Sequence, residues 1–161
     1  MKYLFLPLLS FVTVIAQMVA GSNFYILNFL DLSLILIAYW AVYHNRTQAL
    51  FVGSVTGLLL DAAMMMPLGY NGFGKTLAAF ILGQAWKRFN TRASWVQFVI
   101  VAVSSAASSM SVFVLSWIMQ RHVSRAFLGS SLIQAVVTSL VTIIVLGLLK
   151  NHKPGLPNKA R

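Results

Sequence analysis

The stretch GSVTGLLLDAAMMMPLGYNGFG at residues 53–74 decides the fold of this chain. Gly53, Gly57 and Asp61 within it are spaced by four residues, so on a helix they share one face. A GxxxG pair lets a neighbouring helix approach closely inside a lipid bilayer, because no side chain stands between the two backbones. Asp61 continues the same face and is therefore expected to point toward protein rather than lipid. The stretch predicts a tightly packed helix with one buried carboxylate.

A sharp return of the chain is expected directly after this helix. Pro67 lacks the amide donor that a helix interior needs, and Gly69 tolerates the backbone angles of a tight turn. Lys75 follows the turn and begins the next apolar segment. The two segments are therefore expected to form a helical hairpin.

The composition places the whole chain in a membrane. Hydrophobic residues make up 59% of its 161 residues and charged residues only 9%, whereas soluble domains carry about 25% charged residues. The absence of cysteine excludes disulfides, thiol catalysis and zinc–thiolate sites. The formal net charge of +10 comes from basic residues at the ends of apolar runs, which is a topology signal. No nucleic-acid partner is expected.

Six apolar segments are candidates for spanning helices, which need about 20 residues each. They cover residues 3–20, 26–43, 48–66, 76–86, 94–119 and 131–149. The fourth is the shortest. The sequence therefore predicts an all-α integral membrane protein with six transmembrane helices. One domain is expected over residues 1–150, and a short, disordered basic tail over residues 151–161.

The distribution of basic residues predicts the topology. With six spans, nine Lys and Arg residues lie on the side of the N-terminus and three, Lys75, Arg121 and Arg125, lie on the other side. If the fourth segment did not cross, four would face eight. The cytoplasmic side carries the excess of basic residues, so six spans with both termini in the cytoplasm are favoured.

This topology puts three charged residues in the outer half of the bilayer. Asp31 lies near the outer end of the second segment, Asp61 lies one to two turns below the outer surface, and Lys75 begins the fourth segment. A carboxylate near the centre of a spanning helix costs about 2.5–3.5 kcal/mol, so each acid needs a partner or a purpose. The three are expected to share one polar layer. Asp61 either satisfies a packing seam, which we favour, or belongs to a cluster that docks a partner.

Two strings resemble the rod shape-determining protein MreD family. They are LDLSLILIAYWAVYHNR, from Leu30, and GLLLDAAMMMPLG, from Gly57. The residues that carry the resemblance are Asp31, Tyr39, Trp40, Gly53, Gly57, Leu60, Asp61, Pro67, Leu68 and Gly69. The pattern is specific over residues 30–83. Leu30 departs from it, since many relatives have proline there, and this leaves the start of the second helix open.

The resemblance implies a non-catalytic scaffold of the bacterial cell-elongation machinery in the cytoplasmic (inner) membrane. It implies an MreC-like bitopic partner and membership of an elongasome with MreB filaments, RodA and a class B penicillin-binding protein. It also implies a fold similar to the substrate-binding subunits of energy-coupling-factor vitamin transporters. The inner basic clusters are expected to contact anionic lipids. The sequence leaves a homo-oligomer open.

Three other functions are possible for such a sequence. A vitamin-transporter subunit is the alternative, because Ala16 and Ala20 form a small-residue seam, but the expected outer loops offer few polar side chains for a ligand. An ion pathway would need titratable groups throughout the membrane. The serines at residues 104–111 have no histidine or acid at matching depth for catalysis. We therefore expect no enzyme, cofactor or metal.

The candidate structural or partner-binding residues are Asp31, Gly53, Gly57, Asp61, Pro67, Gly69 and Lys75.

Overall fold

The described residues form six helices and no strands. The structure is a computed structural model and describes residues 5–23, 30–89, 93–119 and 126–152. The helices are α1 (Phe5–Asn23), α2 (Leu32–Tyr43), α3 (Arg46–Ala63), α4 (Tyr70–Arg88), α5 (Ser94–Ile118) and α6 (Ala126–His152). The prediction of an all-α fold with six helices is confirmed.

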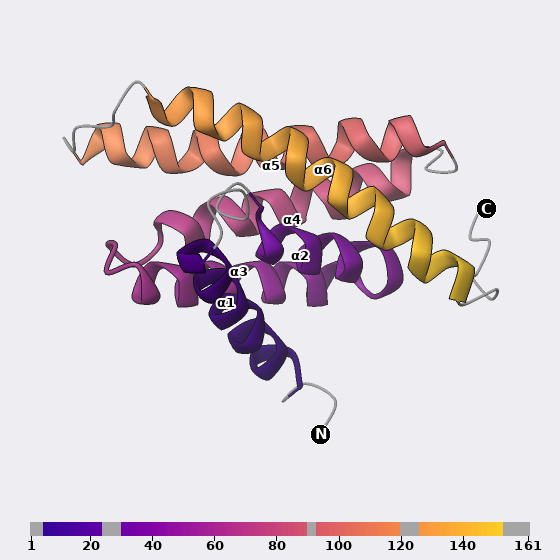
Figure 1. The fold of residues 1–161 in the computed structure, drawn as a ribbon, viewed down its shortest axis with the longest axis horizontal. Helices are drawn as coiled ribbons and strands as arrows, with labels where there is room; N and C mark the ends of the chain where they lie inside the picture. Colours follow the sequence, from indigo (N-terminus) through magenta and orange to yellow (C-terminus); the bar gives the residue numbers. More distant parts are fainter. Residues whose placement is uncertain (1–4, 24–29, 90–92, 120–125, 153–161) are drawn as a thin grey trace.

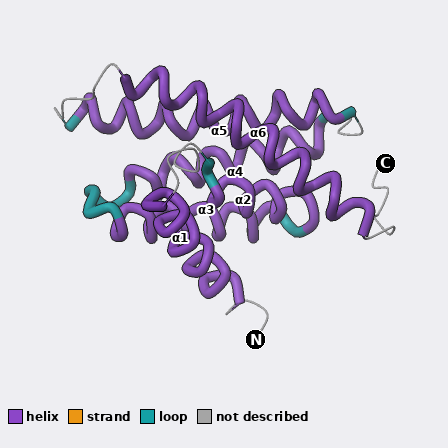
Figure 2. Tube along the Cα trace, in the orientation of Figure 1, coloured by secondary structure: helices purple, strands orange, loops and turns teal. Residues whose placement is uncertain are grey.

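Successive helices from α2 to α6 reverse direction (Figure 1). α3 to α6 run between two opposite ends of the molecule, whereas α2 starts near its middle. The loops in Figure 2 show the same alternation: the α3–α4 turn lies at the left, and the α2–α3 turn lies at the right. The closest pairing is α3 with α4, followed by α4 with α5 and α5 with α6. α1 lies obliquely across α2 and α3, and α2 also contacts α4 and α6.

The interior mixes apolar and small polar side chains. Leu34, Ile37, Leu82 and Val101 are fully buried, and they join α2, α4 and α5 in one core. Several polar and charged side chains are buried as well. Those buried beside this core include Asp31, Thr56, Asp61, Lys75, Ser104, Thr138, Ser139 and Thr142.

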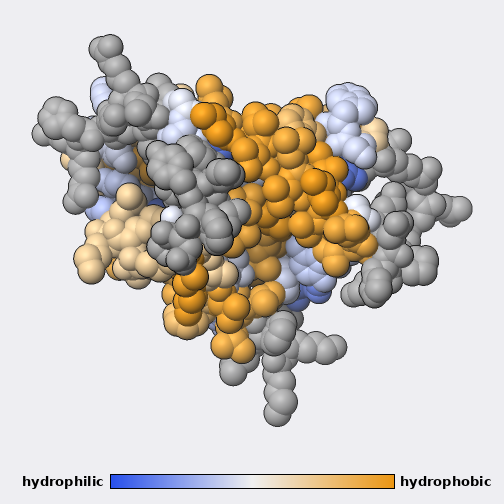
Figure 3. Space-filling model, in the orientation of Figure 1, coloured by the Kyte–Doolittle hydropathy of each residue, from blue (hydrophilic) through white to orange (hydrophobic). Residues whose placement is uncertain are grey.

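The outer surface is apolar across its middle. Large hydrophobic side chains are exposed along α1, α5 and α6, including Leu8, Phe11, Val103, Met110, Leu132, Ile144 and Leu148. In Figure 3 hydrophobic residues cover the middle of the visible face, and hydrophilic residues gather toward its two ends. Such a band is unfavourable in water and favourable in a bilayer, because lipid solvates apolar side chains at no cost.

Two described helices are both long and apolar enough to cross a membrane, over Ser94–Ile118 and Gly129–Leu149. Leu6–Gly21 and Leu32–Tyr43 are shorter apolar helical stretches. α3 and α4 are less apolar because they carry charged residues. Asp61 and Lys75 are buried, and Arg46 is half-buried at the surface. That all six helices cross the bilayer stays a prediction.

Two helix starts differ from the expected ones. α2 begins at Leu32, because Leu30 and Asp31 are not helical; the residues from 26 to 29 lie outside the described part of the chain. α4 begins at Tyr70, not at Thr76, and its 19 residues extend about 28 Å, close to the bilayer core thickness of about 30 Å. Thus the shortest expected segment is a full-length helix, whereas α2 has only 12 residues.

The remaining bounds shift by a few residues. α1 and α3 start and end within three residues of the expected segments, and α6 is longer at both ends. α6 continues to His152, two residues past residue 150, the expected end of the domain. The division into a membrane domain and a tail stays a prediction. Residues 153–161 of that tail lie outside the described residues.

Candidate functional site

The backbones of α3 and α4 are in direct contact at the two glycines of the GxxxG pair. A Cβ atom on Gly57 would lie 2.5 Å from the carbonyl oxygen of Asn71 and 2.6 Å from the Cα of Gly72. A Cβ on Gly53 would lie 2.8 Å from the carbonyl oxygen of Lys75. Real Cβ atoms do not approach backbone atoms so closely, so only glycine fits at either position. α4 is therefore the neighbouring helix whose close approach the GxxxG pair predicted.

α4 is in equally close contact on its other side. A Cβ on Gly74 would lie 2.9 Å from the carbonyl oxygen of Ser108 in α5. α4 is therefore held between α3 and α5 by glycines on both helical seams. Its first half has no room for larger side chains at these points.

Asp61 binds the start of α4. Its Oδ2 accepts hydrogen bonds from the amides of Gly69 and Gly72, at 2.8 Å and 3.1 Å. Its Oδ1 accepts from the amide and the side-chain nitrogen of Asn71, at 2.9 Å and 3.0 Å. The first amides of a helix have no partner within the helix, and they favour a negative charge. The fully buried Asp61 carboxylate provides both the hydrogen-bond acceptors and the negative charge.

The turn between the two helices places these amides. Met66 donates its amide to the carbonyl oxygen of Asp61 at 2.9 Å, which closes the end of α3. Gly69 has a φ of 106°, a left-handed conformation that glycine adopts without strain. Pro67 precedes it, and its carbonyl oxygen accepts the amide of Tyr70 at 3.4 Å. The Pro67–Gly69 turn therefore aims the start of α4 at Asp61.

Asp31 performs the same capping role for α2. Its Oδ1 accepts a hydrogen bond from the Leu34 amide at 3.0 Å and another from the Ser33 hydroxyl at 2.5 Å. Its Oδ2 forms an ion pair with the Lys75 ammonium group of α4. Both charged side chains are buried. The pair joins the start of α2 to α4.

Helices α1 and α6 also reach this point. The amide of Asp31 donates to the Thr138 hydroxyl of α6 at 3.1 Å, and the amide of Ser33 donates to Gln17 Oε1 of α1 at 3.3 Å. These bonds satisfy amides that α2 leaves open by starting inside the bundle, where no water is available in a bilayer. Four helices therefore meet at the start of α2.

The three charged residues occupy two clusters and not one layer. Asp31 and Lys75 are together, while Asp61 binds the first turn of α4, four residues or about 6 Å before Lys75. Thr138, which binds Asp31, is near the middle of the 27-residue α6. The ion pair is thus deeper in the bundle than the expected outer position. The reason is the late start of α2.

A family model described as rod shape-determining protein MreD matches residues 1–152. The chain belongs to the MreD family. The resemblance carried by residues 30–83 is confirmed, and the match extends over nearly the whole chain. Neither a curated protein nor a solved structure matches the chain. A fold like that of the vitamin-transporter subunits therefore has no support from a solved structure.

MreD membership gives this chain a membrane location and a role in rod-shape determination. Its polar clusters fit a structural rather than a chemical task. Both carboxylates are engaged by helix amides, a hydroxyl or Lys75, so they hold helices together. No group of three or more His, Cys, Asp or Glu side chains is placed to hold a metal among the residues that the structure describes.

The sequence did not identify Gln17, Ser33 or Thr138 as members of the cluster around Asp31 and Lys75. Ser33 lies two residues after Asp31, a spacing typical of local capping, and this was the one available signal. Thr138 is 107 residues away from Asp31 in the sequence, so only the packing of α6 reveals it.

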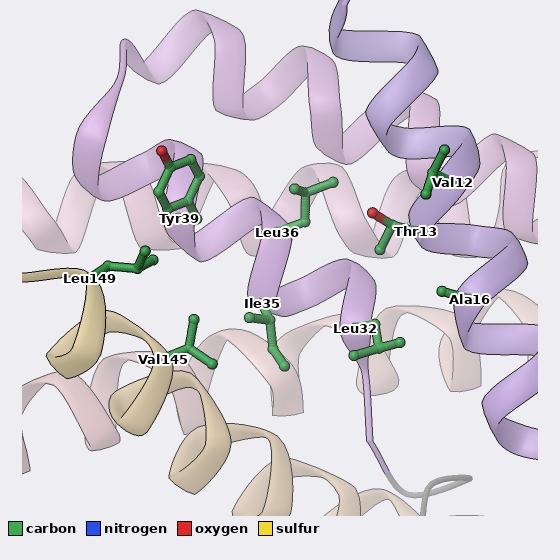
Figure 4. Close-up of a pocket in the computed structure, with 9 residues that line it drawn as sticks. All are labelled: Val12, Thr13, Ala16, Leu32, Ile35, Leu36, Tyr39, Val145 and Leu149. Atoms are coloured by element: carbon green, nitrogen blue, oxygen red, sulfur yellow. The ribbon is translucent and has the colours of Figure 1, made fainter. Parts of the chain in front are cut away.

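A groove over α2 was also missed. Its volume is about 360 Å³, and it is open to the outside of the bundle (Figure 4). α1 and α6 form its walls and α2 its floor, with Val12, Thr13, Ala16, Leu32, Ile35, Leu36, Tyr39, Val145 and Leu149 as lining residues. The Thr13 hydroxyl is bonded to the Leu9 carbonyl oxygen at 2.8 Å, which leaves the wall of α1 effectively apolar.

Proposed function

We propose that this chain is a non-catalytic scaffold of the bacterial cell-elongation machinery, which binds an MreC-like bitopic partner and links MreB filaments to wall synthesis. RodA and a class B penicillin-binding protein are the further expected members of the assembly. Family membership supports the role in cell shape. The observation that carries the partner-binding part is the groove over α2.

The groove suits a single apolar helix. α1 packs on α2 and α3, and α6 packs on α5 and α2, so these two helices stand apart over the middle of α2. Ala16 and Thr13 give α1 a small-residue surface toward the groove, which favours close helix approach in lipid. Aliphatic side chains such as Ile35 and Val145 give the contact area. A bitopic partner contributes one spanning helix of this kind.

The proposed topology has six spans and both termini in the cytoplasm, in the inner membrane. The alternating helix directions and the apolar band across the visible face support it. So does the split of nine basic residues against three. In this topology the buried contacts of Asp31 and Asp61 hold the helices in one arrangement. A scaffold requires such a fixed shape.

The test places a bulky side chain in the groove. Ile35→Trp fills the floor, whereas Ile144→Trp puts the same side chain on the lipid-facing surface of α6, where Ile144 is 61% exposed. Ile35→Trp should reduce co-purification of a tagged MreC-like partner and fail to restore rod shape in depleted cells. Ile144→Trp should behave like the unchanged chain. Full partner binding by a folded Ile35→Trp protein would refute the groove as the docking site.

A further inference from the structure

The two acids of this chain are both committed deep inside the bundle. Asp31 is paired with Lys75, and Asp61 is bound by the amides at the start of α4. The chain has 12 basic residues and only these two acidic ones. No Asp or Glu side chain is therefore left to pair with the other lysines and arginines. Arg46, Lys87 and Arg88 belong to this group.

Arg46 is held in one place on the surface of α4. Its Nη1 donates a hydrogen bond to Gln84 Oε1 at 2.8 Å, and its guanidinium carbon lies 4.4 Å from the centre of the Phe80 ring. Gly83 makes room for the aliphatic part, since a Cβ there would lie 3.0 Å from Arg46 Cγ. A guanidinium has five N–H donors in a planar fork that matches a phosphate. The contacts orient this fork and leave donors free for an anion.

The surroundings favour an anion that carries an apolar tail. Lys87 is one turn beyond Gly83 on α4, so it follows the same face toward the helix end, where Arg88 also lies. In the other direction the surface is apolar: Phe80 is 45% exposed, and Phe51 of the adjacent α3 is 50% exposed. A positively charged end above an exposed aromatic surface matches a phospholipid, not a free anion.

We propose that Arg46, oriented by Gln84 and Phe80 and assisted by Lys87, binds the phosphate of an anionic phospholipid, whose acyl chains lie along the α3–α4 hairpin. The site is at the end of the bundle that carries the α2–α3 turn, which is the cytoplasmic end in the six-span topology. It is independent of the groove over α2, and it does not depend on the proposed role in cell elongation.

The site can be tested on the purified full-length chain in an uncharged detergent. Native mass spectrometry would measure the affinity for phosphatidylglycerol, with phosphatidylcholine and inorganic phosphate as the comparison ligands. We expect phosphatidylglycerol to bind more tightly than phosphatidylcholine. Arg46→Gln should weaken that binding about fivefold, the effect of removing one basic contact to an anionic lipid. Lys159→Gln, which removes the same charge from the C-terminal segment of the sequence, should change it less than twofold.

Two further variants keep the test decisive. Arg46→Lys retains the charge but loses the fork, and Gln84→Leu removes the hydrogen bond that orients the guanidinium. Both should weaken phosphatidylglycerol binding even if Arg46→Gln does not fold. Equal losses in Arg46→Gln and Lys159→Gln, or wild-type affinity in both Arg46→Lys and Gln84→Leu, would overturn the proposal. Competition by inorganic phosphate at the lipid's own concentration would show a free-anion site instead of a lipid site.

Discussion

At the residue scale, Asp31 and Asp61 both cap the start of a helix, but their negative charges are balanced in different ways. Each accepts hydrogen bonds from amides at the start of a helix, and each is buried. Asp61 is bound by neutral donors, and the helix terminus itself balances its charge. Asp31 has a full counter-charge in Lys75. The Asp31–Lys75 pair is the more sensitive to substitution, because loss of either partner leaves an unpaired charge in the interior.

Lys75→Met tests this sensitivity. Removal of one member of a buried ion pair costs about 3–5 kcal/mol, because the other charge is left without compensation. We therefore expect Lys75→Met to lower the unfolding temperature in detergent clearly. Combining it with Asp31→Asn should restore most of the loss, since asparagine also caps a helix and carries no charge. If the double variant lost as much as the two single variants together, the residues would not be coupled.

At the element scale, α4 depends on backbone contact with its neighbours. Gly57 and Gly53 let it touch α3, and Gly74 lets it touch α5. These contacts place Asn71 within reach of Asp61, so packing and capping stabilise the same helix start. This explains why α4, which is less apolar than α5 and α6, forms a helix of full bilayer length.

Gly57→Leu should separate α3 from α4. An oversized side chain in a packed core costs about 1–3 kcal/mol, and here the obstacle is backbone, which yields less than a side chain. We expect a fall in thermal stability at the upper end of that range or beyond. Gly147→Leu is the matched control, because a Cβ on Gly147 meets nothing within 4 Å. Equal unfolding temperatures for the two variants would contradict the seam.

The sequence was informative where a signal is local. The spacing of Gly53, Gly57 and Asp61, followed by Pro67 and Gly69, predicted a helix, its packing face and the turn after it. It could not predict that α2 starts at Leu32, because a run of apolar residues continues on both sides of Asp31. Nor could it predict the Thr138 contact or the groove, since both depend on where α1 and α6 settle relative to α2. Partners distant in sequence leave no periodic pattern.

At the scale of the whole molecule, the crossing of α4 decides the topology. α4 is about 28 Å long and closely packed between α3 and α5, so we expect it to cross the bilayer beside them. If it crosses, its C-terminal end lies on the side of the N-terminus and the end of α5 lies on the opposite side. If it does not cross, these two positions exchange sides.

The absence of cysteine in the chain makes this measurable with single cysteine substitutions. Phe89 follows α4 and Met119 follows α5, and they are 59% and 62% exposed. A membrane-impermeant thiol reagent on intact cells, with the outer membrane opened where one is present, should label Met119→Cys but label Phe89→Cys only after the inner membrane is permeabilised. Leu68→Cys, in the α3–α4 turn, should be labelled under both topologies and controls for reagent access. The reverse result, with Phe89→Cys labelled first, would mean that α4 does not cross. Arg46 and Lys87 would then lie on opposite sides of the bilayer, in conflict with their neighbouring places at one end of the α3–α4 hairpin.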